Sequence, residues 1–137
     1  MEPSIERIVV AAPNKAGEAF VGELLRARIP FAVIVNNRVE LNKVRELGAT
    51  ECIELDTVDQ TTWLLPEFPV GRVFLFETSQ TLTCRYIQIC RAWTVHPIYV
   101  ITHSVHPRLI YKSLGAAYVL HTNTNDVSFL MESIREK

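Results

Sequence analysis

The sequence predicts an α/β fold in which a doubly wound parallel sheet of six strands, in the order 3-2-1-4-5-6, forms the middle of three layers. The first observation is that short, continuously apolar runs alternate with segments of helical periodicity, and such runs are typical of strands covered on both faces. The second is that parallel strands need crossover connections, which are right-handed and usually helical. The third is the length of 137 residues, which predicts a single domain over 1–137.

The first two strands are predicted at 8–12 and 31–35, where the runs IVVAA and FAVIV contain no polar residue. The helix between them covers 17–28, because its apolar residues recur on one face and Pro30 stops it. A second helix follows at 39–47.

Gly48 suits the carboxyl end of that second helix, because glycine readily adopts a positive φ. The third strand is predicted at 50–55, and Asp59 can cap a short helix after it. The run RVFLF at 72–76 is the fourth strand. Either Ser79 or Thr81 can begin the helix that follows. Its apolar face is expected to hold Leu82, Tyr86, Ile89, Cys90 and Trp93.

The remaining strands are predicted at 97–102 and 117–120, each followed by a helix. Pro107 can occupy the first turn of one helix, which Gly115 ends, and Asp126 can cap the last. The residues expected to face inward are Leu109, Ile110 and Leu114 in the first of these helices, and Val127, Leu130, Met131 and Ile134 in the second.

Composition excludes several classes of protein. The 14 basic and 15 acidic residues give a net charge of −1, which offers no electrostatic surface for nucleic acid. The start MEPSIER has no signal-peptide pattern, and the apolar runs are too short to cross a membrane, so no direct membrane insertion is expected. The three cysteines form no C-x-x-C pair, which fits free thiols in a reducing cytoplasm.

The motif inventory indicates neither catalytic residues nor a metal site. No G-x-S-x-G elbow and no Tyr-x-x-x-Lys pair of a short-chain reductase occurs, so an enzymatic activity is not expected, although the sequence leaves the question open. His103 and His106 form an H-x-x-H pattern, but a zinc site needs further ligands, and capping or loop roles account for them better.

The connection after the first strand is the place where ligands bind in such sheets, because they lie beyond the carboxyl ends of the strands. Dinucleotide-binding proteins have G-x-G-x-x-G there, and in this chain the three glycine positions are Ala12, Asn14 and Gly17. The first glycine permits a tight turn, the second admits the pyrophosphate, and the third allows the helix to pack closely on the strand. The stretch therefore predicts either a rebuilt phosphate site or a lost one.

Three stretches resemble the nucleotide-binding N-terminal domain of the regulators of potassium conductance, called the TrkA-N, KTN or RCK domain. They are VVAAPNKAGEAFVGELL, AVIVNNRVELNKVRELGATECIELDTVD and VHPIYVITHSVHPRLIYKSLGAAYVL. The resemblance spans nearly the whole chain and implies a Rossmann-like fold with NAD(P) or an adenine nucleotide as the cofactor. The cofactor-binding residues that it implies are Ala12, Pro13, Asn14, Gly17, Asn36, Asn37, Arg38, Asp56, Thr57 and Thr78.

Several of these positions depart from the family's pattern. The acid that ends the second strand and binds the ribose of NAD is replaced by Asn36, and Arg38 nearby would favour the 2′-phosphate of NADP. Alternatively, Asn36 and Asn37 form a turn and Arg38 begins a helix. Asp56 either lies near the adenine or closes a turn on its own backbone. Glu77 would repel a pyrophosphate, so it binds a hydroxyl or marks an empty site.

Three functions follow from these observations. The first is a regulatory nucleotide-binding module, expected to be a homodimer that controls potassium transport through a membrane transport protein. The second is an NAD(P)H-dependent oxidoreductase of the NmrA-like type. The third is a degenerate Rossmann interaction module that has lost its ligand, which the altered glycine loop and Glu77 would explain.

Overall fold

The computed structural model describes residues 5–56, 59, 63–104 and 108–135. Six parallel strands form one sheet in the order β3-β2-β1-β4-β5-β6, which confirms the predicted topology. The strands are β1 (Arg7–Ala11), β2 (Phe31–Val35), β3 (Cys52–Glu54), β4 (Val70–Phe76), β5 (Ile98–Thr102) and β6 (Tyr118–His121).

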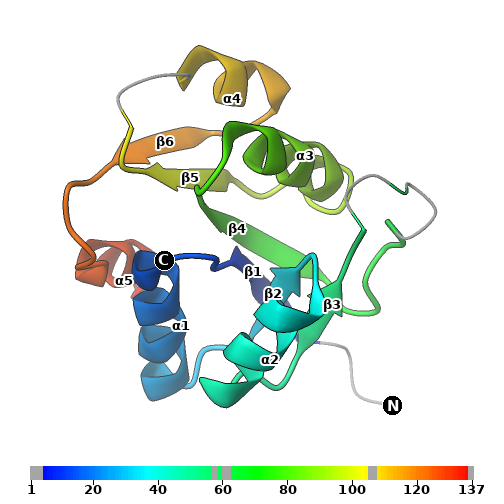
Figure 1. Cartoon of the computed structure of the whole chain (residues 1–137), viewed down its shortest axis with the longest axis vertical. Coiled ribbons are helices and arrows are strands. Elements are labelled where there is room, and N and C mark those ends of the chain that lie inside the picture. Colours follow the sequence, from blue (N-terminus) through cyan, green and yellow to red (C-terminus); the bar gives the residue numbers. More distant parts are fainter. Residues whose placement is uncertain (1–4, 57–58, 60–62, 105–107, 136–137) are drawn as a thin grey trace.

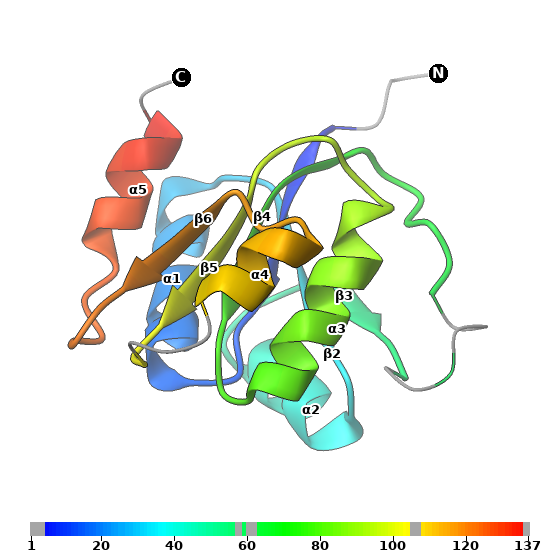
Figure 2. The ribbon, with the colours of Figure 1, turned by 90° about the horizontal axis from the view of Figure 1, so that it is seen from above.

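Helices cover both faces of the sheet, which makes the three predicted layers (Figure 1). One face carries α1 (Lys15–Ala27), α2 (Arg38–Glu46) and α5 (Ser128–Arg135). The other carries α3 (Gln80–Arg91) and α4 (Arg108–Leu114), which lie side by side in both views (Figures 1 and 2). Among the described helices, none combines the length and apolar character that crossing a membrane requires.

Alternate residues of each strand supply the two cores. In β1, Val9 packs with the α3 and α4 side, whereas Val10 packs with the α1, α2 and α5 side, and both are fully buried. This period of two on a doubly covered sheet explains why the strands read as unbroken apolar runs.

Polar caps begin three of the helices that start at the carboxyl edge of the sheet. Asn14, Asn37 and Ser79 each have an extended backbone, and the side chain of each accepts a hydrogen bond from the main-chain N–H three residues on. An N-cap oxygen replaces the helical acceptor that the first turn lacks. The helix α1 therefore begins at Lys15, two residues before the predicted start.

The inward face of α4 differs from the prediction. Leu109 is 85% exposed and Ile110 is 41% exposed, whereas Tyr111 is fully buried. The reason is a hydrogen bond from the Tyr111 hydroxyl to the Glu77 carboxylate, which turns the aromatic side of this short helix toward the sheet.

The connection from β3 to β4 also differs from the other crossovers. In its described residues, 55–56, 59 and 63–69, no helix is formed, and most of the short helix predicted after Asp59 lies outside the described residues. The indole N–H of Trp63 donates to the carbonyl oxygen of Asp56 over 2.9 Å, and this bond joins the middle of the loop to its start.

Candidate functional site

Asn14 lies at the carboxyl end of β1, where the chain turns into α1. Its Oδ1 accepts a hydrogen bond from the N–H of Gly17 at 2.9 Å, and its Nδ2 donates to the carbonyl oxygen of Glu77 at 3.2 Å. The side chain therefore spans from the start of α1 to the end of β4. Since β1 and β4 are the neighbouring strands at which the winding reverses, Asn14 lies at the switch point of the sheet.

Gly17 keeps the packing role of the third glycine in the motif. A Cβ atom at this position would lie 2.7 Å from the Cα of Ala12 and 3.1 Å from the ring of Phe76, both of which are too close. Ala12 fits the first position because its φ is not positive: Arg28 is the one non-glycine residue with a positive φ in the described part of the chain. Alanine therefore introduces no backbone strain here.

These bonds decide how the loop can meet an anion. A helix N-terminus binds phosphate through the free N–H groups of its first turn. In this chain Asn14 takes the N–H of Gly17 and lies over the helix start, where the pyrophosphate would approach. The residues present do not fit a dinucleotide held through its pyrophosphate in the manner of the G-x-G-x-x-G motif.

After β2, Asn36 and Asn37 form a turn and Arg38 begins α2, which is the second of the two alternatives given for these residues. The side chain of Asn37 accepts from the N–H of Glu40 at 2.8 Å and donates to the side chain of Asn36 at 3.1 Å. In return, Oε1 of Glu40 accepts from the N–H of Asn36 at 3.2 Å. Arg38 lies on the surface, with its side chain 78% exposed and Nε 3.4 Å from the carboxylate of Glu54.

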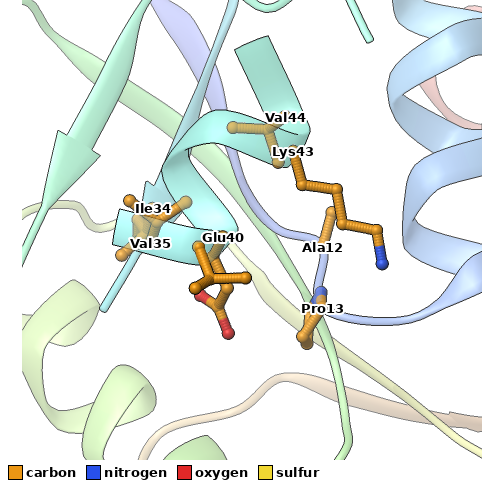
Figure 3. Close-up of a pocket in the computed structure, with 8 residues that line it drawn as sticks. Ala12, Pro13, Ile34, Val35, Glu40, Lys43 and Val44 are labelled. Atoms are coloured by element: carbon orange, nitrogen blue, oxygen red, sulfur yellow. The ribbon is translucent and has the colours of Figure 1, made fainter. Parts of the chain in front are cut away.

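A pocket opens between the loop after β1, the end of β2 and the first two turns of α2 (Figure 3). Its volume is about 110 Å³, which is below the roughly 300–1,000 Å³ usual for small-molecule sites, so it can enclose only part of a nucleoside. Its walls are mainly apolar, with two charged residues. The lining residues are Ala12, Pro13, Ile34, Val35, Val39 and Val44, with the charged pair Glu40 and Lys43.

The two charged residues of the pocket have different partners. The amine of Lys43 lies 2.9 Å from the carboxylate of Glu18 on α1, and this bond, together with the charge of Glu18, raises the pKa of Lys43. Figure 3 shows the ends of Lys43 and Glu40 pointing in different directions. Lys43 thus forms its ion pair with Glu18 and not with Glu40.

Of the ten residues that the sequence indicated, the pocket brings together Ala12 and Pro13. Asp56 and Thr78 are exposed and do not line it, and Thr57 lies outside the described residues.

The sequence did not indicate Glu40 and Lys43 as lining residues, because the dinucleotide-binding motif places its acid at the end of the strand and not on the helix after it. The signal was present for Glu40, since an Asn followed three residues later by Glu is a pattern of helix starts.

Glu77 binds two hydroxyl groups of the chain itself. Its carboxylate accepts from the hydroxyl of Thr102 at 2.5 Å and from the hydroxyl of Tyr111. The carboxylate is thus directed toward β5 and α4, while its backbone carbonyl holds Asn14. Burial and the neighbouring Glu77 raise the pKa of Tyr111.

The histidine pair has no described metal partner. His103 Nδ1 lies 2.6 Å from the carbonyl oxygen of Thr122, and His106 lies outside the described residues. Within the described chain, no group of three or more His, Cys, Asp or Glu side chains is arranged to hold a metal ion.

Solved structures share this fold. The TrkA-N domain of the inner membrane protein ybaL from Escherichia coli has a TM-score of 0.68 at 17% identity, over 99% of this chain and 100% of that one. The NAD(P)-binding domain of an exopolyphosphatase-related protein from Archaeoglobus fulgidus has a TM-score of 0.68 at 18% identity, over 96% and 98%. The GsuK channel bound to NAD has a TM-score of 0.68 at 13% identity, over 87% of this chain and 23% of the channel chain.

No protein-family model and no curated protein matches the sequence. At these identities the likeness establishes the fold. The chain has the Rossmann-like fold of the TrkA-N and RCK domains, as the resemblance in its sequence predicted.

Proposed function

We propose that this chain is a regulatory domain that binds a small adenine nucleotide or nucleoside in the pocket between the loop after β1 and α2. The observation that supports this most directly is the position of the pocket, which lies at the carboxyl edge of the sheet, where open α/β folds bind their ligands. Apolar walls with a carboxylate at one side suit a flat, uncharged base attached to a sugar that carries hydroxyl groups.

The nucleoside part of the ligand, and not its phosphates, is expected to provide most of the affinity. Asn14 already occupies the N–H of Gly17, so a pyrophosphate gains little at the start of α1. NAD and NADP are therefore expected to bind no more tightly than AMP. Under this proposal the chain still binds an adenine nucleotide, as the resemblance implies, but it no longer binds the pyrophosphate of a dinucleotide through the loop after β1.

The regulatory role rests on the resemblance to TrkA-N and RCK domains. Under this proposal the domain acts as a homodimer on a membrane transport protein, in the manner that the potassium-conductance regulators imply. A ligand would act by binding one arrangement of the two subunits more tightly than the other. Light scattering tests the dimer, and a monomer at every concentration would contradict it.

A second candidate, an interaction module without a nucleotide, is favoured by one observation. Oδ1 of Asn14 accepts from the N–H of Gly17, as an anion would at this edge, and its Nδ2 donates to the carbonyl oxygen of Glu77. In that case the domain would act through its surface alone.

Thermal-shift measurements with adenosine, AMP, ADP, NAD and NADP separate the two candidates. A micromolar ligand at millimolar concentration stabilises by RT ln(1 + [L]/Kd), about 4 kcal/mol at a thousandfold excess over Kd. The first candidate predicts similar shifts with adenosine, AMP, ADP and NAD, and no larger shift with NADP. An absence of shift with every compound would leave the second candidate.

Two surface variants make the test specific for the pocket. Val39 lines the pocket but is 77% exposed, so Val39→Trp can fill the mouth without disturbing the core. Val95 is 94% exposed and does not line this pocket, so Val95→Trp is the matched control. Loss of the ligand shift in the first variant alone is the expected result. Equal shifts in both would place the ligand elsewhere.

A further inference from the structure

Glu40 brings a carboxylate to the end of β2 from the first turn of α2. Its Oε1 lies 3.2 Å from the N–H of Asn36, the residue directly after the strand. The side chain is half-buried and lines the pocket together with Pro13 (Figure 3). In Rossmann domains that bind NAD, an acid at the strand end reaches the ribose hydroxyls from this region. This chain has Asn36 at that position.

The second oxygen of Glu40 is available to a ligand. Oε1 holds the N–H of Asn36, and within the described residues no hydrogen bond is made to Oε2. Lys43, one turn further along α2, directs its amine to Glu18. An ionised carboxylate can only accept hydrogen bonds, so the partner it selects is a hydroxyl or an amine and not a phosphate.

Arg38 is poorly placed to receive a 2′-phosphate. Its guanidinium pairs with Glu54 at the end of β3, and it does not line the pocket. Exposed pairs of this kind are weak, so Arg38 is free to move, but the charges that line the pocket are those of Glu40 and of Lys43, whose amine is paired with Glu18. The structure thus argues against the preference for NADP that Arg38 suggested in the sequence.

We propose that Glu40 is the specificity-determining residue of this pocket: its carboxylate accepts a ribose hydroxyl and excludes nucleotides that carry a 2′-phosphate. This rests on the proposed function and narrows its ligand to a nucleoside or nucleotide with a free 2′-hydroxyl. The acid has moved from the strand to the helix, where the same side chain also stabilises the helix start through Asn36.

Calorimetric titration of the wild-type protein with 5′-AMP, 2′-deoxy-5′-AMP and adenosine 2′,5′-bisphosphate is the first test. A hydrogen bond to a charged group predicts a loss of about tenfold or more in affinity for the deoxy compound. The bisphosphate is expected to bind more weakly still, because its 2′-phosphate meets the carboxylate. Equal affinities for 5′-AMP and its deoxy form would overturn the assignment.

The second test is Glu40→Gln, in which the amide oxygen can still accept from Asn36, so the helix start is retained. We expect the variant to lose about tenfold in affinity for 5′-AMP, to change little for the deoxy compound and to bind the bisphosphate better than the wild type does. Glu54→Gln, which removes the partner of Arg38, is the control and should leave all three affinities unchanged. Equal weakening of all three ligands by Glu40→Gln would overturn the proposal.

The two levels of the proposal fail in different ways. If no adenine compound binds the wild-type protein, the proposed function is wrong and the role of Glu40 falls with it. If 5′-AMP binds but the 2′-position makes no difference, the pocket stands and the role of Glu40 alone is refuted.

Discussion

The side-chain amide of Asn14 donates to the carbonyl oxygen of Glu77 across 3.2 Å, so a loop residue at the end of β1 is held by a residue at the end of β4. The two lie 63 positions apart in the sequence and meet at the point where the sheet reverses its winding. The same Asn14 caps α1, so one short side chain fixes both the start of a helix and the approach of two strands.

Two interactions of the Asn14 side chain, the cap bond and the bond to Glu77, are each expected to contribute to stability. Asn14→Ala loses the cap and the bond to Glu77, and should reduce the free energy of unfolding by about 2 kcal/mol. Asn14→Ser keeps a capping oxygen and loses the amide donor, so about half of that loss is expected. Urea denaturation measures both. Equal losses in the two variants would mean that the capping oxygen contributes nothing, and an Asn14→Ser variant as stable as the wild type would mean that the bond to Glu77 contributes nothing.

Gly17 and Gly22 lie in the same helix, but their replacement by alanine is expected to change the stability of the protein in opposite directions. At Gly17 the added Cβ would meet the backbone of Ala12 at 2.7 Å, so the helix must shift, and a loss of roughly 1–3 kcal/mol is expected. At Gly22 the nearest atom would be the end of Arg26 at 3.8 Å, so the better helix propensity of alanine should give a gain of about 0.5–1 kcal/mol. Thermal unfolding of the two variants is the measurement, and a neutral Gly17→Ala would contradict the close packing.

Two buried tyrosines differ in whether their hydroxyl is paired. Tyr111 donates to Glu77, so Tyr111→Phe leaves the carboxylate with one donor fewer and should cost about 1–3 kcal/mol. The hydroxyl of Tyr86 is buried and has no hydrogen-bond partner in the described part of the chain, so Tyr86→Phe should be neutral or stabilising. Denaturant midpoints compare the pair, and a large loss for Tyr86→Phe would reveal a partner for that hydroxyl.

Alkaline pH should weaken the fold through Tyr111. Burial and Glu77 raise its pKa in the folded state, so the unfolded chain releases the phenolic proton first, near pH 10. Stability from this group is complete below about pH 10 and is lost as pH rises further. The wild type should therefore lose more stability than Tyr111→Phe between pH 8 and pH 10.5 in urea titrations. Tyr86 and Cys90, whose pKa values burial also raises, are present in both proteins and cancel in the comparison.

Arg28 ends α1 with a φ of +58°, in the left-handed region that glycine occupies without strain. Arg28→Gly is expected to raise the free energy of unfolding by about 0.5–1 kcal/mol, since relief of strain outweighs the added freedom of the unfolded chain. Gly115, with a φ of +127°, is the opposite control. Gly115→Ala should destabilise, because its Cβ would also lie 2.8 Å from the Arg91 side chain. A destabilised Arg28→Gly would show that the arginine side chain makes contributions beyond its backbone.

The sheet was predictable because its central strands β1, β2, β4 and β5 are largely buried on both faces and so read as apolar runs. The face of α4 was not, because Leu109 and Ile110 are apolar yet exposed, and the orientation of the helix depends on Tyr111 meeting Glu77, 34 positions away.

In the candidate site, too, the contacts between residues far apart in the sequence were not predictable. The motif in the sequence indicated the loop of Asn14, but the position of the Asn14 side chain depends on the carbonyl oxygen of Glu77, which lies 63 positions away. The carboxylate of Glu40 was overlooked because it reaches the end of β2 from the neighbouring helix.

The cap on α1 has a consequence for signalling. A loop that is ordered by a metabolite reports the level of that metabolite through the fraction of molecules in which it is ordered. Here the ordering group is part of the polypeptide, present at a constant effective concentration whatever the state of the cell. The order of this loop therefore does not depend on a metabolite, and under the proposed function a bound compound would act on the rest of the domain through α2, which supplies half of the residues that line the pocket.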